Sequence, residues 1–359
     1  LALAAILSKL SEQARRDGPA MHWIALPFLS AGGAQQVAIN LCRALRELRP
    51  DASVVLLVPD CRSPGAMPPL PDGVCVVSFG DYLGEGASYT RKQSLLRALL
   101  RAGQPVCFHN IKSDVAWHLL VSEGERLKQY TRLYASIFAF QFNPGGQEKI
   151  GYAAYFLQEA MPHLSGLLSD NGRFIDDAAL EYGFDDQARA RSVVLHQPCR
   201  LEPQMGEAWP GALRLAMRRQ QLQEGASAAE RPQILWAGRL DDEKRVDLFL
   251  DVVRHCTFAD FYVFGQVVLG DEAALPQLAN LRYEGPFSSP TEWVVRHDFD
   301  AFLFTSRWEG MPNVLIEAGA MGIPIIAPTV GGVRDLVRKE TRYPLPERPS
   351  VADYEHAIR

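Results

Sequence analysis

The sequence predicts an α/β protein with two doubly wound domains that face each other across a cleft. Short apolar runs alternate with segments of helical periodicity over residues 22–196 and again over residues 234–327, which is typical of parallel sheets covered by helices. Residues 197–211, rich in Pro and Gly and without apolar periodicity, separate the two series. A length of 359 residues also fits two domains of about 150 residues each.

Composition and charge exclude several classes of protein. With 47% hydrophobic and 22% charged residues, the chain can form a large core and is not disordered. A net charge of −5 argues against nucleic acid as the main partner. The 6 cysteines are dispersed without a CxxC or Cys/His cluster, so neither a zinc site nor a disulfide framework is expected, and a reducing cytoplasm fits best. No apolar stretch reaches the roughly 20 residues that span a bilayer.

The first domain is predicted over residues 1–198 and begins with an amphipathic helix over residues 1–17, whose apolar face is expected to pack on a neighbouring element. The chain begins with Leu rather than Met, so no targeting prediction follows from this helix. Strands are then expected at residues 23–29, 53–58, 74–79, 106–109, 133–140, 166–169 and 193–196. Helices are expected at residues 34–48, 94–102, 150–159 and 173–182.

A linker is predicted over residues 199–210, and a second domain over residues 211–359. This domain is expected to begin with a basic helix at residues 212–223. Its strands are expected at residues 234–237, 261–264, 281–283, 301–305 and 323–327. One helix is expected to begin near Asp242. Another is expected over residues 314–321, with Asn313 as its N-cap and Gly322 at its end.

Residues 300–332 carry the strongest chemical signal, because a strand, a polar loop and a helix start follow one another there. The first turn of a helix presents unpaired N–H groups and partial positive charge. Glu309 lies in the loop and Glu317 in the helix, with seven residues between them. This arrangement suits a phosphate that carries a sugar, with the phosphate on the amides and the sugar hydroxyl groups bonded to the two carboxylates. The alternative is an ordinary helix start with two solvated acids.

Polar residues follow other predicted strands, where ligands bind in open α/β sheets. Gly32 and Gly33 let a backbone approach a phosphate, or else simply form a tight turn. Arg239 and Lys244 offer two cations for phosphate oxygens, unless the acids between them pair with them. His109 is a proton acceptor or, like most lone histidines, a structural residue. The chain has neither a G-x-G-x-x-G nor a P-loop motif, which disfavours a nicotinamide cofactor and an NTPase.

Two segments of the second domain, ILWAGRLDDEKRVDLFLDVV and SRWEGMPNVLIEAGAMGIPIIAPTVGGVRDLV, resemble glycosyltransferase family 4, the retaining GT-B enzymes that use nucleotide sugars. The resemblance covers residues 233–337 and includes the two glutamates of the family's signature as Glu309 and Glu317. In the first domain, SAGGAQQVAINLCRAL and LLSDNGRFIDDAALEYGF match more loosely. The resemblance implies the GT-B fold, with two Rossmann-like domains.

The resemblance also assigns roles to residues of this chain. Arg239 and Lys244 are expected to bind the donor diphosphate, and Glu317 the ribose hydroxyls. Glu309 and the backbone that follows it are expected to hold the donor sugar, while His109 lies on the acceptor side. The catalytic residues are thus expected to be Glu309, Lys244, Arg239 and His109. Further donor-site residues are Gly32, Gly33, Gly310, Met311, Pro312, Asn313 and Val314.

The implied reaction moves a sugar from a UDP- or GDP-type donor to a hydroxyl of a glycan or lipid-linked glycan, as in bacterial surface polysaccharide synthesis. Front-face attack, assisted by the leaving phosphate, would retain the anomeric configuration. No cofactor and no metal are expected, since cations and helix amides can stabilise the charge of the leaving diphosphate. The expected location is the cytoplasm, including a peripheral position at the inner face of the membrane.

The chain departs from the family at Gln35, where Glu is common, and at Arg245, where Gly is common. It also stops at Arg359, before the helices with which such enzymes usually cross back to the first domain, so the chain is expected to be part of a larger one. Two other functions stay open. One is a nucleotide-sugar epimerase of the same fold, and the other is a nucleotide-sugar-binding protein without turnover.

Overall fold

The computed structural model describes residues 1–29, 32–60, 69–84, 86–143, 146–199, 220, 231–266, 275–287, 289–337 and 343–359. The chain divides into two compact units, unit 1 (Leu1–Gln197) and unit 2 (Pro198–Arg359). The first domain was predicted to end one residue later, at residue 198. The predicted linker beyond residue 199 and the predicted helix at residues 212–223, apart from Gln220, lie outside the described residues.

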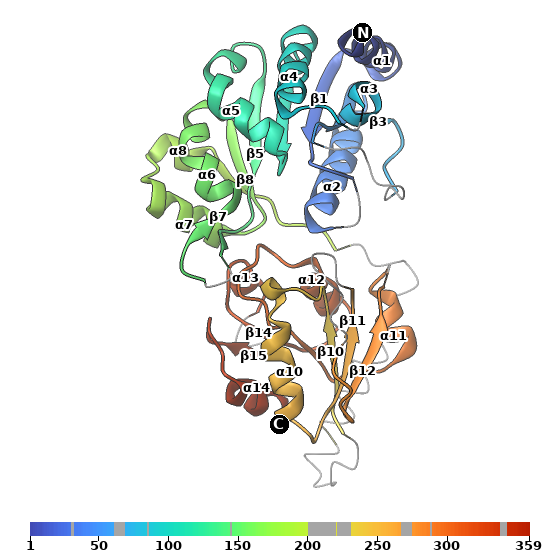
Figure 1. Ribbon diagram of the computed structural model, residues 1–359, viewed down its shortest axis with the longest axis vertical. Coiled ribbons are helices and arrows are strands. Elements are labelled where there is room, and N and C mark those ends of the chain that lie inside the picture. The colour runs from blue at the N-terminus through green and yellow to red at the C-terminus, as the bar shows by residue number, and fades with distance from the viewer. Residues whose placement is uncertain are drawn as a thin grey trace. The chain divides into compact units, whose positions relative to one another are not determined.

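Unit 1 is built on a parallel sheet of 7 strands in the order β3-β2-β1-β4-β5-β8-β9, with helices on both faces (Figure 1). The strands are β1 (Ala20–Ala25), β2 (Ala52–Val58), β3 (Val74–Ser78), β4 (Cys107–Ile111), β5 (Arg132–Ser136), β8 (Gly166–Ser169) and β9 (Ser192–Val194). The helices are α1 (Ala2–Asp17), α2 (Gly33–Leu48), α3 (Phe79–Leu83), α4 (Tyr89–Gly103), α5 (Asp114–Leu127), α6 (Gly151–Ala160), η1 (Met161–His163), α7 (Gly172–Tyr182) and α8 (Asp186–Ala190). An antiparallel pair, β6 (Gln141–Phe142) and β7 (Lys149–Ile150), lies outside this sheet.

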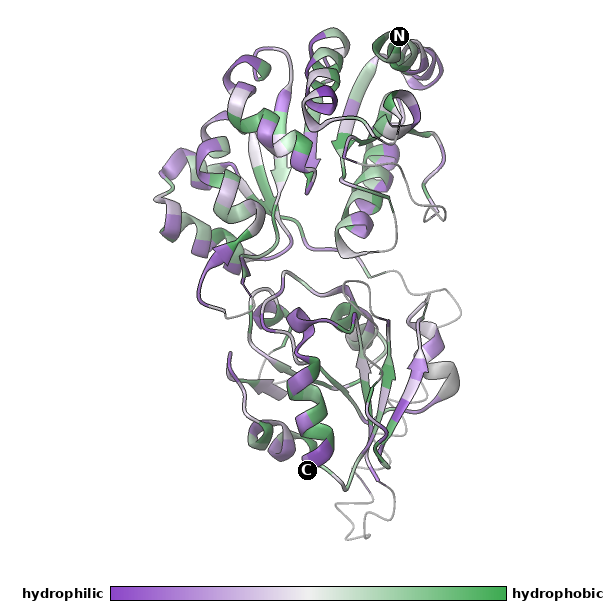
Figure 2. Ribbon diagram, viewed as in Figure 1, coloured by the Kyte–Doolittle hydropathy of each residue, from purple (hydrophilic) through white to green (hydrophobic). Residues whose placement is uncertain are grey.

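The core of unit 1 lies on both faces of its sheet, because successive residues of a strand point to opposite sides. On one face, Trp23 and Phe108 pack in a cluster with residues of α1, α4, α5 and α6. On the other face, Ile24 and Val54 pack with residues of α2. Hydrophobic residues accordingly concentrate in the strands, and the helices carry polar residues on their outer sides (Figure 2).

Unit 2 is built on a parallel sheet of 6 strands in the order β12-β11-β10-β13-β14-β15 (Figure 1). The strands are β10 (Gln233–Ala237), β11 (Asp260–Phe264), β12 (Leu281–Gly285), β13 (Ala301–Leu303), β14 (Ile325–Pro328) and β15 (Tyr343–Leu345). The helices are η3 (Asp242–Lys244), α10 (Val246–His255), α11 (Thr291–Arg296), α12 (Asn313–Ala320), α13 (Val333–Leu336) and α14 (Val351–Ile358). This strand order is that of a doubly wound, dinucleotide-binding sheet.

The core of unit 2 also lies on both faces of its sheet, because successive strand residues point to opposite sides. Leu235 and Phe302 pack on one face with residues of α11, α12 and α13. Ile234 and Leu303 pack on the other face with α10 and α14. Tyr354 of α14 is fully buried there, and its hydroxyl donates a hydrogen bond of 2.8 Å to the backbone oxygen of Phe304.

The predicted strands of both units are present, but several of their ends differ. β1 ends at Ala25 instead of residue 29, and β5 ends at Ser136 instead of residue 140. The sequence did not predict α3, α5 or β15. No helix in the described part of the chain is both long and apolar enough to cross a membrane.

Candidate functional site

The strand order of unit 2 reverses between β10 and β13, its two central strands. In doubly wound sheets, ligands bind beyond the carboxyl ends of the strands at such a switch point. Arg239 and Lys244 lie in the segment after β10, and Glu309 lies in the loop after β13. The topology therefore brings together the two segments that the sequence predicts to hold the donor.

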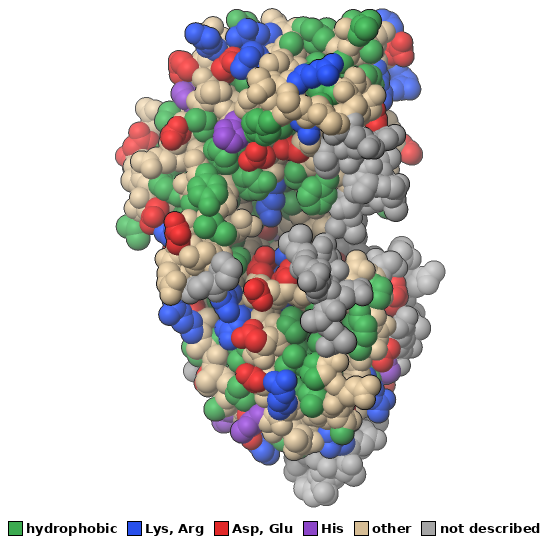
Figure 3. Space-filling view, in the orientation of Figure 1, with side chains coloured by type: hydrophobic (Ala, Val, Ile, Leu, Met, Phe, Trp, Pro, Cys, Tyr) green, Lys and Arg blue, Asp and Glu red, His purple; other side chains and the backbone are tan. Residues whose placement is uncertain are grey.

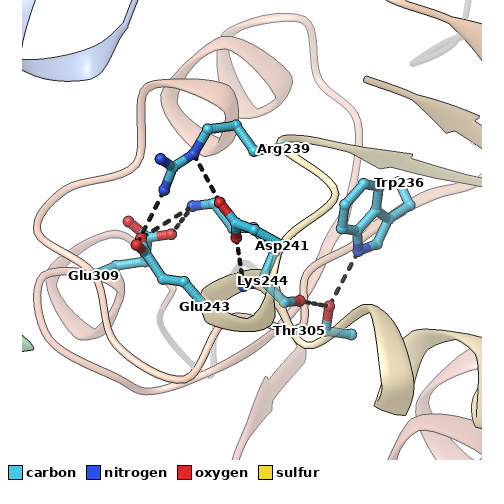
Figure 4. Close-up of polar contacts among 7 residues, drawn as sticks. All are labelled: Trp236, Arg239, Asp241, Glu243, Lys244, Thr305 and Glu309. Carbon is cyan, nitrogen blue, oxygen red and sulfur yellow. Dashed lines mark hydrogen bonds and ion pairs between the residues drawn. The ribbon is translucent and has the colours of Figure 1, made fainter. Parts of the chain in front are cut away.

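The segment after β10 holds Arg239 between two carboxylates (Figure 4). Arg239 Nε lies 3.2 Å from Asp241 Oδ2, and Arg239 Nη2 lies 3.0 Å from Glu243 Oε2. Asp241 also caps η3, because its Oδ1 accepts a hydrogen bond of 3.3 Å from the backbone nitrogen of Lys244. Burial raises the pKa of the Asp241 carboxyl, although the Arg239 charge acts in the opposite direction. The pairing with nearby acids is therefore present, while the Arg239 side chain stays 40% exposed.

Lys244 joins the two loops, because its Nζ contacts Glu309 Oε1 directly (Figure 4). Both side chains are largely buried, with 14% of Lys244 and 12% of Glu309 exposed. The backbone of Lys244 is fixed as well. Thr305 Oγ1 donates a hydrogen bond of 2.6 Å to the Lys244 oxygen and accepts one of 3.0 Å from Trp236 Nε1. A cation and a carboxylate from the segments after β10 and β13 thus form one ion pair.

Two glycines permit close contact between the loops at this edge. Gly331 has a φ of 47°, and a Cβ there would overlap the backbone oxygen of Glu309. Gly265, after β11, has a φ of 153°, and a Cβ there would overlap the backbone oxygen of Gly238. Both positions need glycine for its conformation and for its size. Gly265 therefore brings the end of β11 against the backbone of Gly238.

The start of α12 differs from the prediction in its cap. Pro312, not Asn313, is the N-cap, and no side chain caps the helix in the described structure. The first intrahelical bonds run from the backbone nitrogens of Leu315 and Ile316 to the Pro312 oxygen, at 3.1 and 3.3 Å. The N–H groups of Asn313 and Val314 therefore precede the helical hydrogen bonds and are directed out of the helix start. This is the geometry that an anion requires.

Glu317 lies in the second turn of α12 and is mostly buried. Burial raises the pKa of its carboxyl to about 7. Within the described ranges, no side-chain or backbone group forms a hydrogen bond with this carboxylate. The negative charge of Glu317 also contributes, after burial, to the raised pKa of the Cys199 thiol. A mostly buried carboxylate that has no hydrogen-bond partner among the described residues can accept hydrogen bonds from ligand hydroxyl groups.

Unit 1 holds the other predicted site residues, Gly32, Gly33 and His109. A Cβ at Gly33 would meet nothing within 4 Å, so the packing of this unit leaves that space open. A Cβ at Gly32 would overlap only the end of the Gln35 side chain. His109 does not end its strand as predicted, because β4 continues to Ile111. Its ring is buried, its Nε2 lies 2.8 Å from Ser136 Oγ, and burial lowers its pKa to about 4. The ring is therefore neutral at physiological pH and paired with Ser136 inside the sheet, and the acceptor-side role expected of His109 stays a prediction.

Sequence reasoning missed Thr305 and Gly331, whereas it gave the pairing of Arg239 and Lys244 with the acids between them, now seen at Glu243, as an alternative. Glu243 contacts Arg239, its Oε1 lies 3.8 Å from Lys244 Nζ, and its backbone oxygen accepts a hydrogen bond of 2.9 Å from the Arg307 nitrogen. Thr305 and Gly331 fix the two loops. Among the described residues, no three His, Cys, Asp or Glu side chains are grouped as a metal site requires.

Comparisons with known proteins agree with this fold. Residues 231–359 match the family model described as "Glycosyl transferases group 1". No curated protein is significantly similar in sequence to the chain. The HepE protein of Anabaena, solved with UDP and glucose, has a TM-score of 0.63 at 14% identity over 94% of this chain and 88% of its own.

Two further solved structures are similar to 94% of the chain. The lipopolysaccharide outer core galactosyltransferase WaaB has a TM-score of 0.62 at 14% identity, over 94% of this chain and 89% of its own. Sucrose-phosphate synthase from Thermosynechococcus elongatus has a TM-score of 0.63 at 14% identity, over 94% of this chain and 88% of its own. The chain therefore has the predicted GT-B fold. The match over residues 231–359 and these structures together support a glycosyltransferase enzyme.

Proposed function

We propose that this chain is a retaining, family 4 glycosyltransferase that moves a hexose from a UDP- or GDP-sugar to a hydroxyl of a glycan or lipid-linked glycan. The observation that carries the proposal is the meeting of Arg239, Lys244 and Glu309 at the switch point of unit 2. The Anabaena HepE structures support a uridine donor, because they were solved with UDP or UDP-glucose. The WaaB similarity supports a cell-surface glycan as the product.

The donor diphosphate is proposed to bind Arg239, Lys244 and the N–H groups of Asn313 and Val314. Without donor, carboxylates occupy both cations, so the diphosphate must compete with them. When Lys244 turns toward the phosphates, Glu309 loses its partner and is free to accept hydrogen bonds from hydroxyls of the sugar. Donor binding and sugar recognition are thereby coupled through one ion pair.

Glu317 is proposed to accept hydrogen bonds from the ribose hydroxyls. The carboxylate lies in the helix whose start binds the diphosphate, so ribose and phosphate would meet successive turns of α12. Gly33 is proposed to leave room for the phosphates, and an open space at its Cβ position agrees with this role.

The reaction breaks the bond between the anomeric carbon and the leaving phosphate oxygen. Negative charge grows on the diphosphate as this bond lengthens, and the two cations and two amides stabilise it most strongly at that moment. The acceptor hydroxyl attacks the same face of the sugar and passes its proton to the leaving phosphate oxygen, which retains the anomeric configuration. The proposed reaction uses no protein nucleophile, cofactor or metal.

Incubation of the chain with UDP-, GDP-, ADP- and CMP-sugars, with a glycan acceptor mixture, tests the proposal by product analysis. We expect one donor to yield a glycoside of retained configuration, and the free nucleoside diphosphate. Glu309→Ala and Lys244→Ala should abolish transfer while the chain stays folded by circular dichroism. Sugar isomers formed without any acceptor would indicate the epimerase instead, and donor binding without turnover would indicate a binding protein.

A further inference from the structure

Unit 1 carries a second group of polar and aromatic side chains at the carboxyl edge of its own sheet. Asp60 follows β2 and Asp114 begins α5 after β4, and these two strands flank β1. Ligands of doubly wound sheets bind beyond this edge. Around it lies an aromatic surface, which we define by its members Tyr89, Asp114, His118, Tyr155 and Phe156.

The rings of this surface form a continuous series from α4 to α6. Tyr89 meets His118 edge-on with ring centroids 5.4 Å apart, and His118 meets Phe156 edge-on at 4.7 Å. Tyr155 continues the series at 6.4 Å from Phe156. Buried Trp117 stacks behind Phe156 at 6.0 Å and fills the space between α5 and α6. Packing between these helices therefore does not require Tyr155, which remains 59% exposed.

Polar atoms stand beside the rings and face solvent. The side chains of Asp114 and His118 are 45% and 48% exposed, with 3.9 Å between Asp114 Oδ2 and His118 Nε2. The Tyr89 hydroxyl donates a hydrogen bond of 3.0 Å to the backbone oxygen of Asp114. The surface thus combines apolar ring faces with an acceptor and an imidazole, which is the composition of a site for an amphipathic ligand.

The start of α5 is held rigidly, so these groups are fixed before any ligand binds. Asp60 Oδ2 accepts a hydrogen bond of 2.5 Å from Ser113 Oγ, and its Oδ1 accepts one of 3.0 Å from the Val115 nitrogen. Lys92 Nζ donates to the backbone oxygen of Asp60. Because Asp114 lies between the two anchored residues, its position is set by Asp60. Such preorganisation reduces the entropy lost on binding.

The carboxylates at this edge bear on the class of ligand, although the Lys92 ammonium lies beside Asp60. Burial, followed by the charges of Asp60 and Asp114, raises the pKa of the Tyr152 hydroxyl to about 12. Acidic, histidine and hydrophobic side chains adjoin over α5 in the space-filling view (Figure 3). A phosphate would be repelled by the exposed Asp114 carboxylate, whereas sugar hydroxyls would donate hydrogen bonds to it.

We propose that the aromatic surface binds an uncharged sugar ring of the acceptor, with the apolar side of the ring on Tyr155 and Phe156 and its hydroxyls on Asp114 and His118. The inference rests on the transfer reaction proposed above and deepens it by naming the acceptor class. The surface recognises a hydroxyl-rich, neutral glycosyl end in preference to a phosphorylated one.

Ligand-observed NMR titrations of the full chain test this proposal. The probes are the methyl glycosides of glucose, galactose, mannose and N-acetylglucosamine, together with glucose 1-phosphate. Tyr155→Ala and His118→Ala remove exposed side chains of the surface, and Tyr130→Ala is the matched control, an exposed tyrosine beyond the end of α5. We expect at least one methyl glycoside to bind and its affinity to fall about tenfold in the first two variants, but not in the control.

Three results would overturn the proposal. These are no binding of any methyl glycoside, equal affinities in all variants, or tighter binding of glucose 1-phosphate than of its neutral counterpart. Thermal stabilisation by UDP is measured in the same samples and should be unchanged in every variant. If UDP and the other nucleoside diphosphates all failed to stabilise the unsubstituted chain, the donor assignment would be wrong, and that outcome is separate from the glycoside result.

Discussion

Glu317→Gln is expected to stabilise the ligand-free chain at neutral and higher pH. The carboxylate lies mostly buried in α12, and burial alone accounts for its raised pKa. Its ionised form is therefore poorly solvated in the folded chain and well solvated in the unfolded one. Glutamine keeps the size of the side chain and removes the charge, so the variant avoids the free-energy cost of burying an ionised carboxylate.

The magnitude follows from the pKa, which burial raises from 4.5 to about 7. Below pH 4.5 the carboxyl is protonated in the folded and the unfolded chain, and it adds nothing to the pH dependence. As the pH rises toward 7, the unfolded chain loses this proton first, so the free energy of unfolding falls. At about 1.4 kcal/mol per pKa unit, with a discount for partial exposure, the loss is roughly 2–3 kcal/mol.

Urea unfolding at pH values of about 5 and 8 measures this effect on the transition of unit 2. The variant should gain roughly 2–3 kcal/mol over the unsubstituted chain at the higher pH and much less at the lower one. Glu355→Gln is the control, since hydrogen bonds from Arg359 and His255 lower the pKa of Glu355 and its substitution should not stabilise. An equal effect of Glu317→Gln at both pH values, or a loss of stability at the higher one, would show that burial does not destabilise the ionised Glu317 carboxylate.

Three further predictions concern the framework of the donor site. Arg245 has a φ of 54°, so Arg245→Gly should raise the free energy of unfolding by about 0.5–1 kcal/mol in urea titrations, and a decrease would contradict this. Gly331→Ala should lower the free energy of unfolding by about 2 kcal/mol or more and weaken UDP binding. Gly285→Ala, at a positive φ in open space, should lower the free energy of unfolding by only about 1 kcal/mol. Glu243→Gln releases a partner of Arg239 and should tighten UDP binding in calorimetry by about 0.5–1 kcal/mol, with weaker binding as the opposing result.

Much of the fold was predictable because the signals are local. Strands buried on both faces form continuous apolar runs, so β10, β11 and β14 were found from composition alone, with small errors at their ends. The loop after β13 was equally clear, since Gly and Pro mark it between a strand and a helix. The residues predicted for the donor site therefore lie in the loop and the helix that the sequence predicts there.

What could not be predicted depends on contacts between distant parts of the chain. The pairing of Lys244 with Glu309 exists because β10 and β13 are neighbours, and no local pattern encodes that contact. His109 lies inside its strand because the pairing of β4 with β5 extends to Ile111. α5 was missed because its buried residues occupy adjacent positions such as Val115, Ala116 and Trp117, which hides a helical period.

Calorimetric titration with UDP, GDP, ADP and CDP, comparing the unsubstituted chain with Lys244→Ala and Arg239→Ala, tests whether the two cations bind the donor diphosphate. We expect one of the four to bind the unsubstituted chain and each substitution to weaken this binding at least about tenfold, because a cation on the diphosphate is lost. The loss should shrink at high ionic strength, since the interaction is electrostatic. Affinities unchanged in both variants would contradict the placement of the donor diphosphate at the switch point of unit 2.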